Sequence, residues 1–468
     1  MKRFFLFAVI IVLALFSVNS YGLPYEDAGI PPLPSGPIYD DTETAGFEVT
    51  NYTTNRPAEN TVHYRTRGVT KLGRAGFAQQ VNVLTQTCNQ EAKLVAWAVK
   101  KADGSGFVLK SVKEIAADYE ATHAGWKVVG GINADQYYPL YGDKGHRDGS
   151  DYFFPQPYGC LIADGEKWFA VNARPYTNNG TYLAGFLNDG STDQIWEGRT
   201  HWGINDSSRF KLSGLYLSLY EGDSLLGQYE LENFNEPPGE NESSLYSPIY
   251  QGMRVIPSPP VQGANLFVVE AADLAYTSNS STYTYKGNNG QNAFFGKGVI
   301  SSTGTSATLR KGQFAVDTRD PELLEALYAG ARIVVQFEFA GMINEVEAAT
   351  AYHQIMRQND QDVASTSSYN VQRYPRSFFG RKADGTMVLV TVDGSQGTRG
   401  MYGTNQFEGC AVLKYFGVVE AYQMDGGGSV TMIVRQNDHF VVVNSPSDGK
   451  PRPVLSALLF VVRDTESF

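Results

Sequence analysis

The chain has 468 residues, of which 42% are hydrophobic and 19% are charged. This apolar content is enough for a sizeable core and excludes an intrinsically disordered protein. The formal net charge of −11 and the lack of a basic run argue against nucleic acid as a partner. The 48 glycines and 28 tyrosines are typical of strand-rich proteins with many turns.

The N-terminus has the pattern of a secretory signal peptide over residues 1–22. Lys2 and Arg3 precede an apolar run over 4–16, and small residues follow it. An uncleaved membrane anchor is the alternative, but the run is short for a bilayer span, which needs about 20 residues. We therefore expect a secreted protein, extracellular or in the cell envelope, with no stable membrane insertion after cleavage.

Residues 23–61 are rich in proline, threonine and asparagine, and we expect an exposed leader there. One domain is predicted from 62 to 465, with a divergent, loop-rich middle over 139–300 in which short alternating runs indicate β-structure between long loops. The cysteines are too few and too widely spaced for a disulfide framework. A single disulfide between two of them is the alternative, and the sequence does not select the pair. The cysteines are Cys88, Cys160 and Cys410.

The first half of the domain is predicted to combine strands with one helix. Apolar residues alternate or run together in three predicted strands, at 78–87, 94–101 and 126–133. Ser111 and Glu114 have the spacing of a capping box, which predicts a helix beginning there.

Three further helices are predicted in the second half. Asp320 followed by proline starts one over 320–330. A second capping-box spacing predicts a helix over 344–356, and a third, Asn405 with Glu408, predicts one that ends at Gly417.

Strands surround the last of these helices. They are predicted within 376–394 and at 418–424, 430–435, 440–443 and 454–462. Helices and hairpins both recur along the chain, so the predicted fold class is α+β (mixed α/β), with strand-rich mixed sheets and a few packed helices.

The run from Asp425 through Gly426, Gly427 and Gly428 to Ser429 is the most unusual local feature. Glycine-rich phosphate loops of nucleotide-binding proteins open a helix, whereas a predicted strand follows this run. We therefore predict a tight hairpin whose successive N–H groups form a nest for an anion. A plain turn is the alternative, although three glycines exceed what a two-residue turn requires.

Other polar residues stand where predicted strands end or loops turn. An arginine recognises phosphate through its planar fork of donors, and polar groups at strand ends commonly face a crevice. Each residue taken alone fits a turn or a solvated surface equally well. They are Asn133, Asp135, Arg376, Asp393, Arg399 and Arg452.

The order of these motifs resembles the phosphodiester glycosidase family. The segments that carry the resemblance lie between Pro375 and Val462 and read PRSFFG, DGTMVLVTVDG, RGM, DGGGSVTM, VNSPSDG and RPVLSALLFV. The resemblance extends back to GGINADQYY and YGCLIADGEKW. Ala134 stands where the family usually has glycine, and this change leaves the substrate open.

The resemblance implies an enzyme that cleaves a sugar from a sugar-1-phosphate diester in glycans or envelope polysaccharides. Negative charge grows on the leaving phosphate and positive charge on the anomeric carbon, so the site requires donors and a carboxylate. We expect Asp425, Asp393 and Asn133 to be catalytic, with Asp425 the favoured acid. The substrate and its phosphate are assigned to Arg376, Arg399, Gly426, Gly427, Gly428, Ser429, Asp135 and Arg452.

Two alternatives use the same residues differently. The oxygen atoms of the candidate carboxylates and of Asn133 suit Ca²⁺ or Mg²⁺, although no EF-hand spacing is present. A non-catalytic carbohydrate-binding surface protein that retains the fold is the other alternative. The nucleophile elbow of serine esterases is absent from the sequence, which argues against that class of hydrolase.

Overall fold

The computed structural model describes residues 45–464, with gaps at 73–74, 103–106, 135–136, 139–155, 158–159, 171–180, 201–209, 235–236, 247–260, 275–281, 286–292, 311, 342–344 and 364–371. The predicted signal peptide and most of the predicted leader lie outside the described residues. Among the described residues, no helix is both long and apolar enough to cross a membrane.

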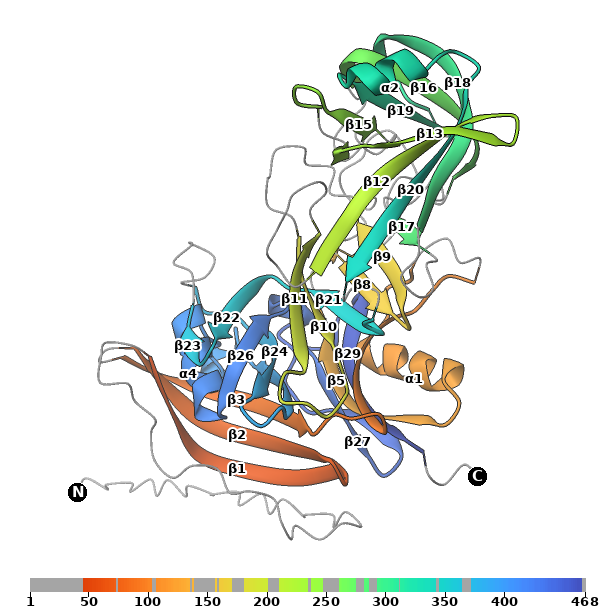
Figure 1. Ribbon diagram of the computed structural model, residues 1–468. Helices are drawn as coiled ribbons and strands as arrows, with labels where there is room; N and C mark the ends of the chain where they lie inside the picture. Colours follow the sequence, from red (N-terminus) through yellow and green to blue (C-terminus); the bar gives the residue numbers. More distant parts are fainter. Residues whose placement is uncertain are drawn as a thin grey trace, which may run out of the picture.

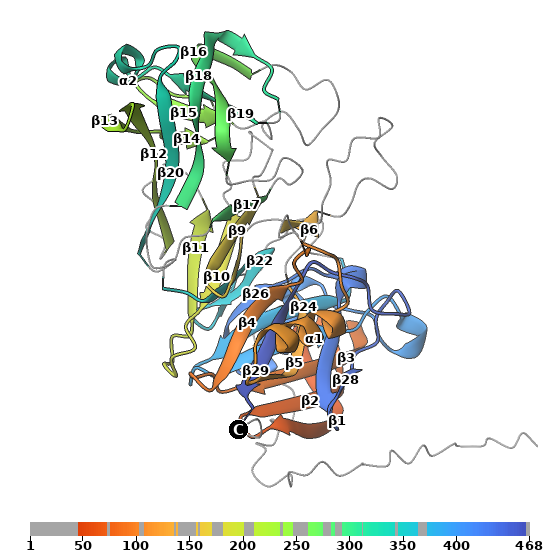
Figure 2. The same ribbon diagram turned by 90° about the vertical axis from the view of Figure 1, so that its right-hand side faces the viewer.

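Two sheets stacked face to face form the lower body in Figures 1 and 2. The first sheet has eight strands, in the order β1 (Gly46–Ala58), β2 (Thr61–Leu72), β3 (Ala75–Gln86), β25 (Met387–Val392), β24 (Arg376–Lys382), β26 (Val418–Gln423), β22 (Gln354–Gln358) and β23 (Gln361–Asp362). The five-stranded sheet has the order β28 (His439–Val442), β27 (Met432–Gln436), β5 (Trp126–Asn133), β29 (Ser456–Arg463) and β4 (Ala92–Ala98).

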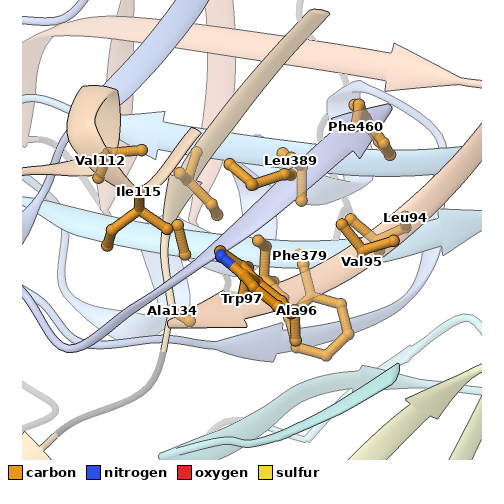
Figure 3. Packing of buried hydrophobic residues seen from close by; sticks show 14 of the residues in the cluster. Leu94, Val95, Ala96, Trp97, Val112, Ile115, Ala134, Phe379, Leu389 and Phe460 are labelled. Atoms are coloured by element: carbon orange, nitrogen blue, oxygen red, sulfur yellow. The ribbon is translucent and has the colours of Figure 1, made fainter. Parts of the chain in front are cut away.

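Apolar side chains of both sheets form the core between them. Leu84, Leu389 and Phe379 are direct neighbours across the first sheet and pack with Phe460 of the five-stranded sheet. Figure 3 shows Leu389, Phe379 and Phe460 within this cluster. The opposite face of the first sheet packs against α4 (Gln406–Tyr415). The helix α1 (Val112–Thr122) packs with residues of the five-stranded sheet in the core cluster. The first sheet is therefore buried on both faces, which explains why β25, with the sequence MVLVTV, is an almost continuous apolar run.

A second lobe projects from this body, and Figures 1 and 2 both show it as the green part of the chain. Its eight-stranded sheet has the order β13 (Ser224–Glu230), β12 (Phe210–Glu221), β20 (Arg332–Gly341), β18 (Ala293–Ala307), β16 (Val261–Leu274), β19 (Gln313–Thr318), β15 (Ser243–Tyr246) and β14 (Asn233–Phe234). The short helix α2 (Pro321–Ala326) packs on it through Leu323. The middle of the domain, predicted as β-structure with long loops, thus contains the long strands of this sheet.

A six-stranded sheet lies between the lobe and the body. Its order is β11 (Ile195–Thr200), β10 (Thr181–Phe186), β21 (Ala348–Ala351), β8 (Cys160–Ala163), β9 (Glu166–Ala170) and β17 (Thr282–Tyr285). Ile162, Leu183 and Ala349 from this sheet pack into the core of the lobe. A two-stranded ribbon of β6 (Tyr137–Tyr138) and β7 (Gln156–Pro157) completes the described strands.

The structure corrects the predicted fold class in part. The described residues are strand-rich and contain three α-helices, so the fold is closer to all-β than to α+β. The helix predicted over 344–356 is wrong, because β21 and β22 occupy 348–351 and 354–358. All four residues of β21 are buried between β10 and β8, so tertiary packing overrides the helical pattern.

The first sheet begins earlier than the predicted domain start. Strand β1 occupies 46–58, within the segment predicted as a leader, and pairs antiparallel with β2. Its sequence includes Pro57, which is tolerated because β1 lies at the edge of the sheet.

Both described capping boxes form as predicted, and they differ in burial. Asn405 caps α4 and is 3% exposed, while Ser111 caps α1 at the surface. Asn405→Ala is expected to lower the free energy of unfolding by about 1–2 kcal/mol, because the buried Glu408 N–H loses its acceptor. Ser111→Ala is expected to cost about 0.5–1 kcal/mol, because water can replace the exposed cap. Chemical denaturation measures both, and a larger loss for Ser111→Ala would contradict this assignment.

Candidate functional site

The glycine run crosses from one sheet to the other. Strand β26 pairs with β24 and β22 in the first sheet, whereas β27 pairs with β5 and β28 in the five-stranded sheet. The predicted hairpin is therefore wrong, because the strands on either side of the run belong to different sheets. The run itself contains a short 3₁₀ turn, η5 (Gly427–Ser429).

Backbone hydrogen bonds hold the run where three segments meet. Asp425 N donates to Ala134 O at 3.1 Å, which joins the run to the residue after β5. Met424 N donates to Ser377 O at 2.9 Å, and Gly427 N donates to Pro375 O at 2.9 Å. The end of β5, the start of β24 and the glycine run therefore converge at Asp425.

Asn133 lies inside this junction as a buried connector. Its Nδ2 donates to Asp425 O at 2.8 Å, and its Oδ1 accepts from Ser377 Oγ at 2.7 Å and from Thr431 N at 3.2 Å. The residue is 1% exposed. The structure brings Asn133 to Asp425 as predicted, but the amide oxygen already accepts two protein donors, so the side chain ties the run to β24 and to Thr431.

Asp425 presents a half-buried carboxylate at the junction. Gly426 N donates to its Oδ1 at 3.0 Å. Burial raises the pKa of Asp425, and the Ser429 hydroxyl, the Gly426 N–H and the positive charge of Arg452 partly offset this rise. A carboxyl group whose pKa is raised holds a proton more readily than an exposed aspartate, which suits it to proton transfer.

Two of the three glycines have separate structural reasons. Gly427 has a φ of +62°, in the left-handed region that side chains disfavour. A Cβ on Gly428 would lie 2.0 Å from Arg452 Nη2 and 2.4 Å from Asp448 Oδ2. Arg452 and Asp448 form an exposed ion pair with an N–O distance of 2.8 Å, so the run passes directly beneath a surface guanidinium.

The predicted nest of amides is not formed by the first two glycines. Gly426 N donates to the Asp425 carboxylate and Gly427 N donates to Pro375 O, so both amides are already used within the protein. Arg452 and Ser429 remain the predicted phosphate-binding groups that lie beside Asp425.

Arg376 is buried and bonded to protein groups, which argues against its predicted contact with phosphate. It is 0% exposed, and its guanidinium donates to Thr404 O at 2.7 Å, Gln423 Oε1 at 3.1 Å and Gln372 O at 3.0 Å. Arg399 is exposed in the turn η4 (Gly397–Arg399) and donates to Gln396 Oε1. No bond described in the structure joins Arg399 to the Asp425 junction.

Asp393 is also buried, with both carboxylate oxygens occupied. Oδ2 accepts from Gln80 Nε2 at 2.7 Å and from Ser445 N at 2.9 Å, while Oδ1 accepts from Asn444 Nδ2 at 3.1 Å. The residue is 0% exposed. These contacts argue against the predicted role of Asp393 as a carboxylate facing the anomeric carbon.

The pKa of Asp393 predicts a specific pH dependence of stability. Burial raises the pKa of this carboxyl to about 6, despite the opposing bonds from Ser445, Asn444 and Gln80 and the charge of Arg65. The native state therefore binds more protons than the unfolded chain between about pH 4 and 6. As pH rises through this window, the free energy of unfolding should fall by about 3 kcal/mol more in the wild type than in Asp393→Asn. Denaturant titrations of both proteins at pH 4 and pH 7 measure this difference. An equal fall in the free energy of unfolding for the wild type and for Asp393→Asn would contradict it.

Several polar groups near the junction were not among the predicted site residues. Three buried atoms make no hydrogen bond with the protein: Thr404 Oγ1, Gln423 Nε2 and Thr431 Oγ1. An unmade hydrogen bond costs about 1–3 kcal/mol for a buried group, so such atoms are candidates for contact with a ligand or water. Gln423 ends β26 and Thr431 directly precedes β27, so a polar residue on each side of the glycine run was the available signal in the sequence.

Neither a metal site nor a disulfide is found among the described residues. No group of three or more His, Cys, Asp or Glu side chains gathers in the described part of the chain. Asp135 lies outside the described residues. Cys88 and Cys410 are buried free thiols, and the side chain of Cys160 is not described.

Known proteins match this chain over different lengths. A SPbeta prophage-derived uncharacterized protein of Bacillus subtilis is 30% identical over 95 residues, which are 20% of this chain and 14% of that protein. A crystal structure of a hypothetical protein from Synechocystis covers 89% of this chain and 64% of its own, with 14% identity and a TM-score of 0.48.

The catalytic domain of zebrafish N-acetylglucosamine-1-phosphodiester alpha-N-acetylglucosaminidase, auto-inhibited by its pro-peptide, has 12% identity and a TM-score of 0.37. That comparison covers 90% of this chain and 88% of the zebrafish one. A family model described as phosphodiester glycosidase matches residues 269–461, the part that contains Arg376, Asp393 and the glycine run. The resemblance of this chain to the phosphodiester glycosidase family is thereby confirmed over its C-terminal part.

Proposed function

We propose that the protein is an exported hydrolase that cleaves a sugar from a sugar-1-phosphate diester, acting on sugar-phosphate-containing glycans or envelope polysaccharides. The family match over 269–461 supports the class of reaction. The observation that carries the proposal is the half-buried carboxylate of Asp425, held where β5, β24 and the glycine run meet and next to Arg452. A carboxylate beside a cation is what a sugar-phosphate linkage requires.

The residues at the junction supply both the carboxylate and the cationic donors that this reaction requires. Asp425 would stabilise the positive charge that grows at the anomeric carbon, or accept a proton from the attacking water. The guanidinium of Arg452 and the hydroxyl of Ser429 would donate to the departing phosphate. Phosphate is a good leaving group, so one carboxylate near the anomeric carbon is sufficient for this scheme.

A panel of defined substrates tests the proposal. Purified protein is incubated with UDP-sugars and with synthetic sugar-1-phosphate methyl diesters that differ in sugar and in anomer. The expected result is release of free sugar from at least one of them, with an equal amount of UDP from a UDP-sugar or of methyl phosphate from a methyl diester. No release from any member of a panel that covers the common sugars in both anomers would count against the enzyme.

The non-catalytic carbohydrate-binding protein remains the second candidate because of one observation. Asp393 has both oxygens occupied by protein donors, so the site presents one of the two carboxylates expected from the sequence. Specific retention on a glycan array, without turnover of the panel, would favour this candidate.

A further inference from the structure

Asp393 joins the two sheets of the body through its carboxylate. It directly follows β25 of the first sheet and accepts from Gln80 of β3 in the same sheet. Its other two donors, Asn444 Nδ2 and Ser445 N, belong to the segment that follows β28 of the five-stranded sheet. The carboxylate is therefore a link between the sheets at the end of the sandwich where the glycine run crosses.

Asn444 carries this link to the residues that directly follow the glycine run. Its Nδ2 donates to Val430 O at 3.1 Å, and its Oδ1 accepts from Met432 N at 2.8 Å. The Asp393 carboxylate fixes the orientation of the amide, because a flipped Asn444 would turn its oxygen toward the carboxylate and its NH₂ toward Met432 N. Asn444 thus clamps the backbone on both sides of Thr431.

The clamp continues to the reacting carboxylate. Thr431 N donates to Asn133 Oδ1, and Asn133 Nδ2 donates to Asp425 O. Each group in this series is at least nine-tenths buried, apart from Asp425 itself. A shift of Asn444 would therefore move both ends of the glycine run relative to the rest of the site.

We propose that Asp393 is a positioning residue that acts through Asn444 to hold the glycine run, and with it Asp425, in the geometry that hydrolysis needs. This inference rests on the proposed function for its kinetic consequences. Because neither side chain contacts substrate in this scheme, losing either one should lower kcat with little change in KM. A displacement of about 1 Å in a catalytic group can cost about 100-fold in rate.

A double-mutant cycle separates positioning from direct catalysis. Asp393→Asn and Asn444→Ala are each expected to lower kcat about 10- to 100-fold, and the double variant should be no slower than the slower single variant. If Asp393 acted on the substrate itself, Asp393→Asn would lose far more than Asn444→Ala and the two losses would multiply. That result would overturn the proposal.

Asn188→Ala serves as a matched control. Asn188 is a buried asparagine that clamps Leu94 through both backbone groups, with bonds of 2.8 Å and 3.0 Å, in a different part of the body. This variant should lose stability, with the added strain of a φ of +53°, and still keep kcat within about twofold. If Asn188→Ala lost as much kcat as Asn444→Ala, the loss in Asn444→Ala would be explained by reduced stability alone, and the proposal would be wrong.

Amide hydrogen exchange tests the clamp independently of turnover. The Met432 amide is bonded to Asn444 Oδ1, so its protection should fall in both Asp393→Asn and Asn444→Ala but not in Asn188→Ala. Unchanged protection of Met432 in Asp393→Asn would overturn the proposal. If the wild-type protein shows no turnover but the exchange pattern is as expected, the proposed function is refuted. The structural link from Asp393 through Asn444 to the glycine run would then still be supported.

Discussion

Replacing Asp425 with asparagine is expected to lower kcat for a sugar-1-phosphate diester by about 10²- to 10⁴-fold. Asparagine keeps the size of the side chain and can still accept from Gly426 N, but it carries no negative charge and cannot accept a proton. The backbone bonds of residue 425 to Ala134 and Asn133 do not involve its side chain, so the fold should persist. Initial rates and a thermal melt of the same sample measure the two effects.

Asp384→Asn is the control for this substitution. Asp384 is an exposed aspartate in the turn between β24 and β25, and its side chain accepts from Thr386 N. The kcat of the Asp384→Asn variant should match that of the wild type. Retention of more than a tenth of the wild-type kcat in a folded Asp425→Asn protein would remove Asp425 from the chemistry.

Replacing Arg376 with methionine should have the largest effect on stability. The substitution keeps an unbranched apolar stem, but two buried acceptors, Thr404 O and Gln423 Oε1, lose their donor, and the bond to the exposed Gln372 is lost as well. An unpaired buried acceptor costs about 1–3 kcal/mol, so we expect a loss of about 3–5 kcal/mol in the free energy of unfolding. Denaturant unfolding followed by fluorescence measures this loss.

Arg399→Met is the matched control, because Arg399 is exposed and its described side-chain bond is to the neighbouring Gln396. It should change stability by less than about 0.5 kcal/mol. If Arg376→Met instead kept its stability and raised KM for the diester, the predicted phosphate contact of Arg376 would be restored and the structural role would be wrong.

The features that sequence predicts well are those determined by neighbouring residues. The capping boxes at Ser111 and Asn405 form as expected, because the bonds of each join residues three apart. The C-terminal strands also lie close to their predicted positions, since runs such as MVLVTV fit a strand buried on both faces. The convergence of Asn133 with Asp425 was indicated by the order of motifs and not by any local pattern.

The features that sequence did not predict depend on pairing between distant segments. The glycine run was expected to be a hairpin because strands flank it, but the chain alone does not say that β26 and β27 belong to different sheets. Burial of Asp393 follows from the stacking of those sheets, and burial of Arg376 follows from the segment before α4 that covers the opposite face of the first sheet. Neither arrangement can be read from the local sequence, and both make an expected ligand-binding group internal. For the same reason, the helical spacing after Glu347 gave way to the central strand β21.

The position of bond cleavage tests the central claim most directly. The panel substrate with the fastest turnover is hydrolysed in H₂¹⁸O, and mass spectrometry locates the label in the two products. Attack at the anomeric carbon places ¹⁸O in the free sugar and none in the phosphomonoester, which is the result that the proposed function predicts. Label in the phosphomonoester would mean attack at phosphorus and would contradict a glycosidase acting through Asp425.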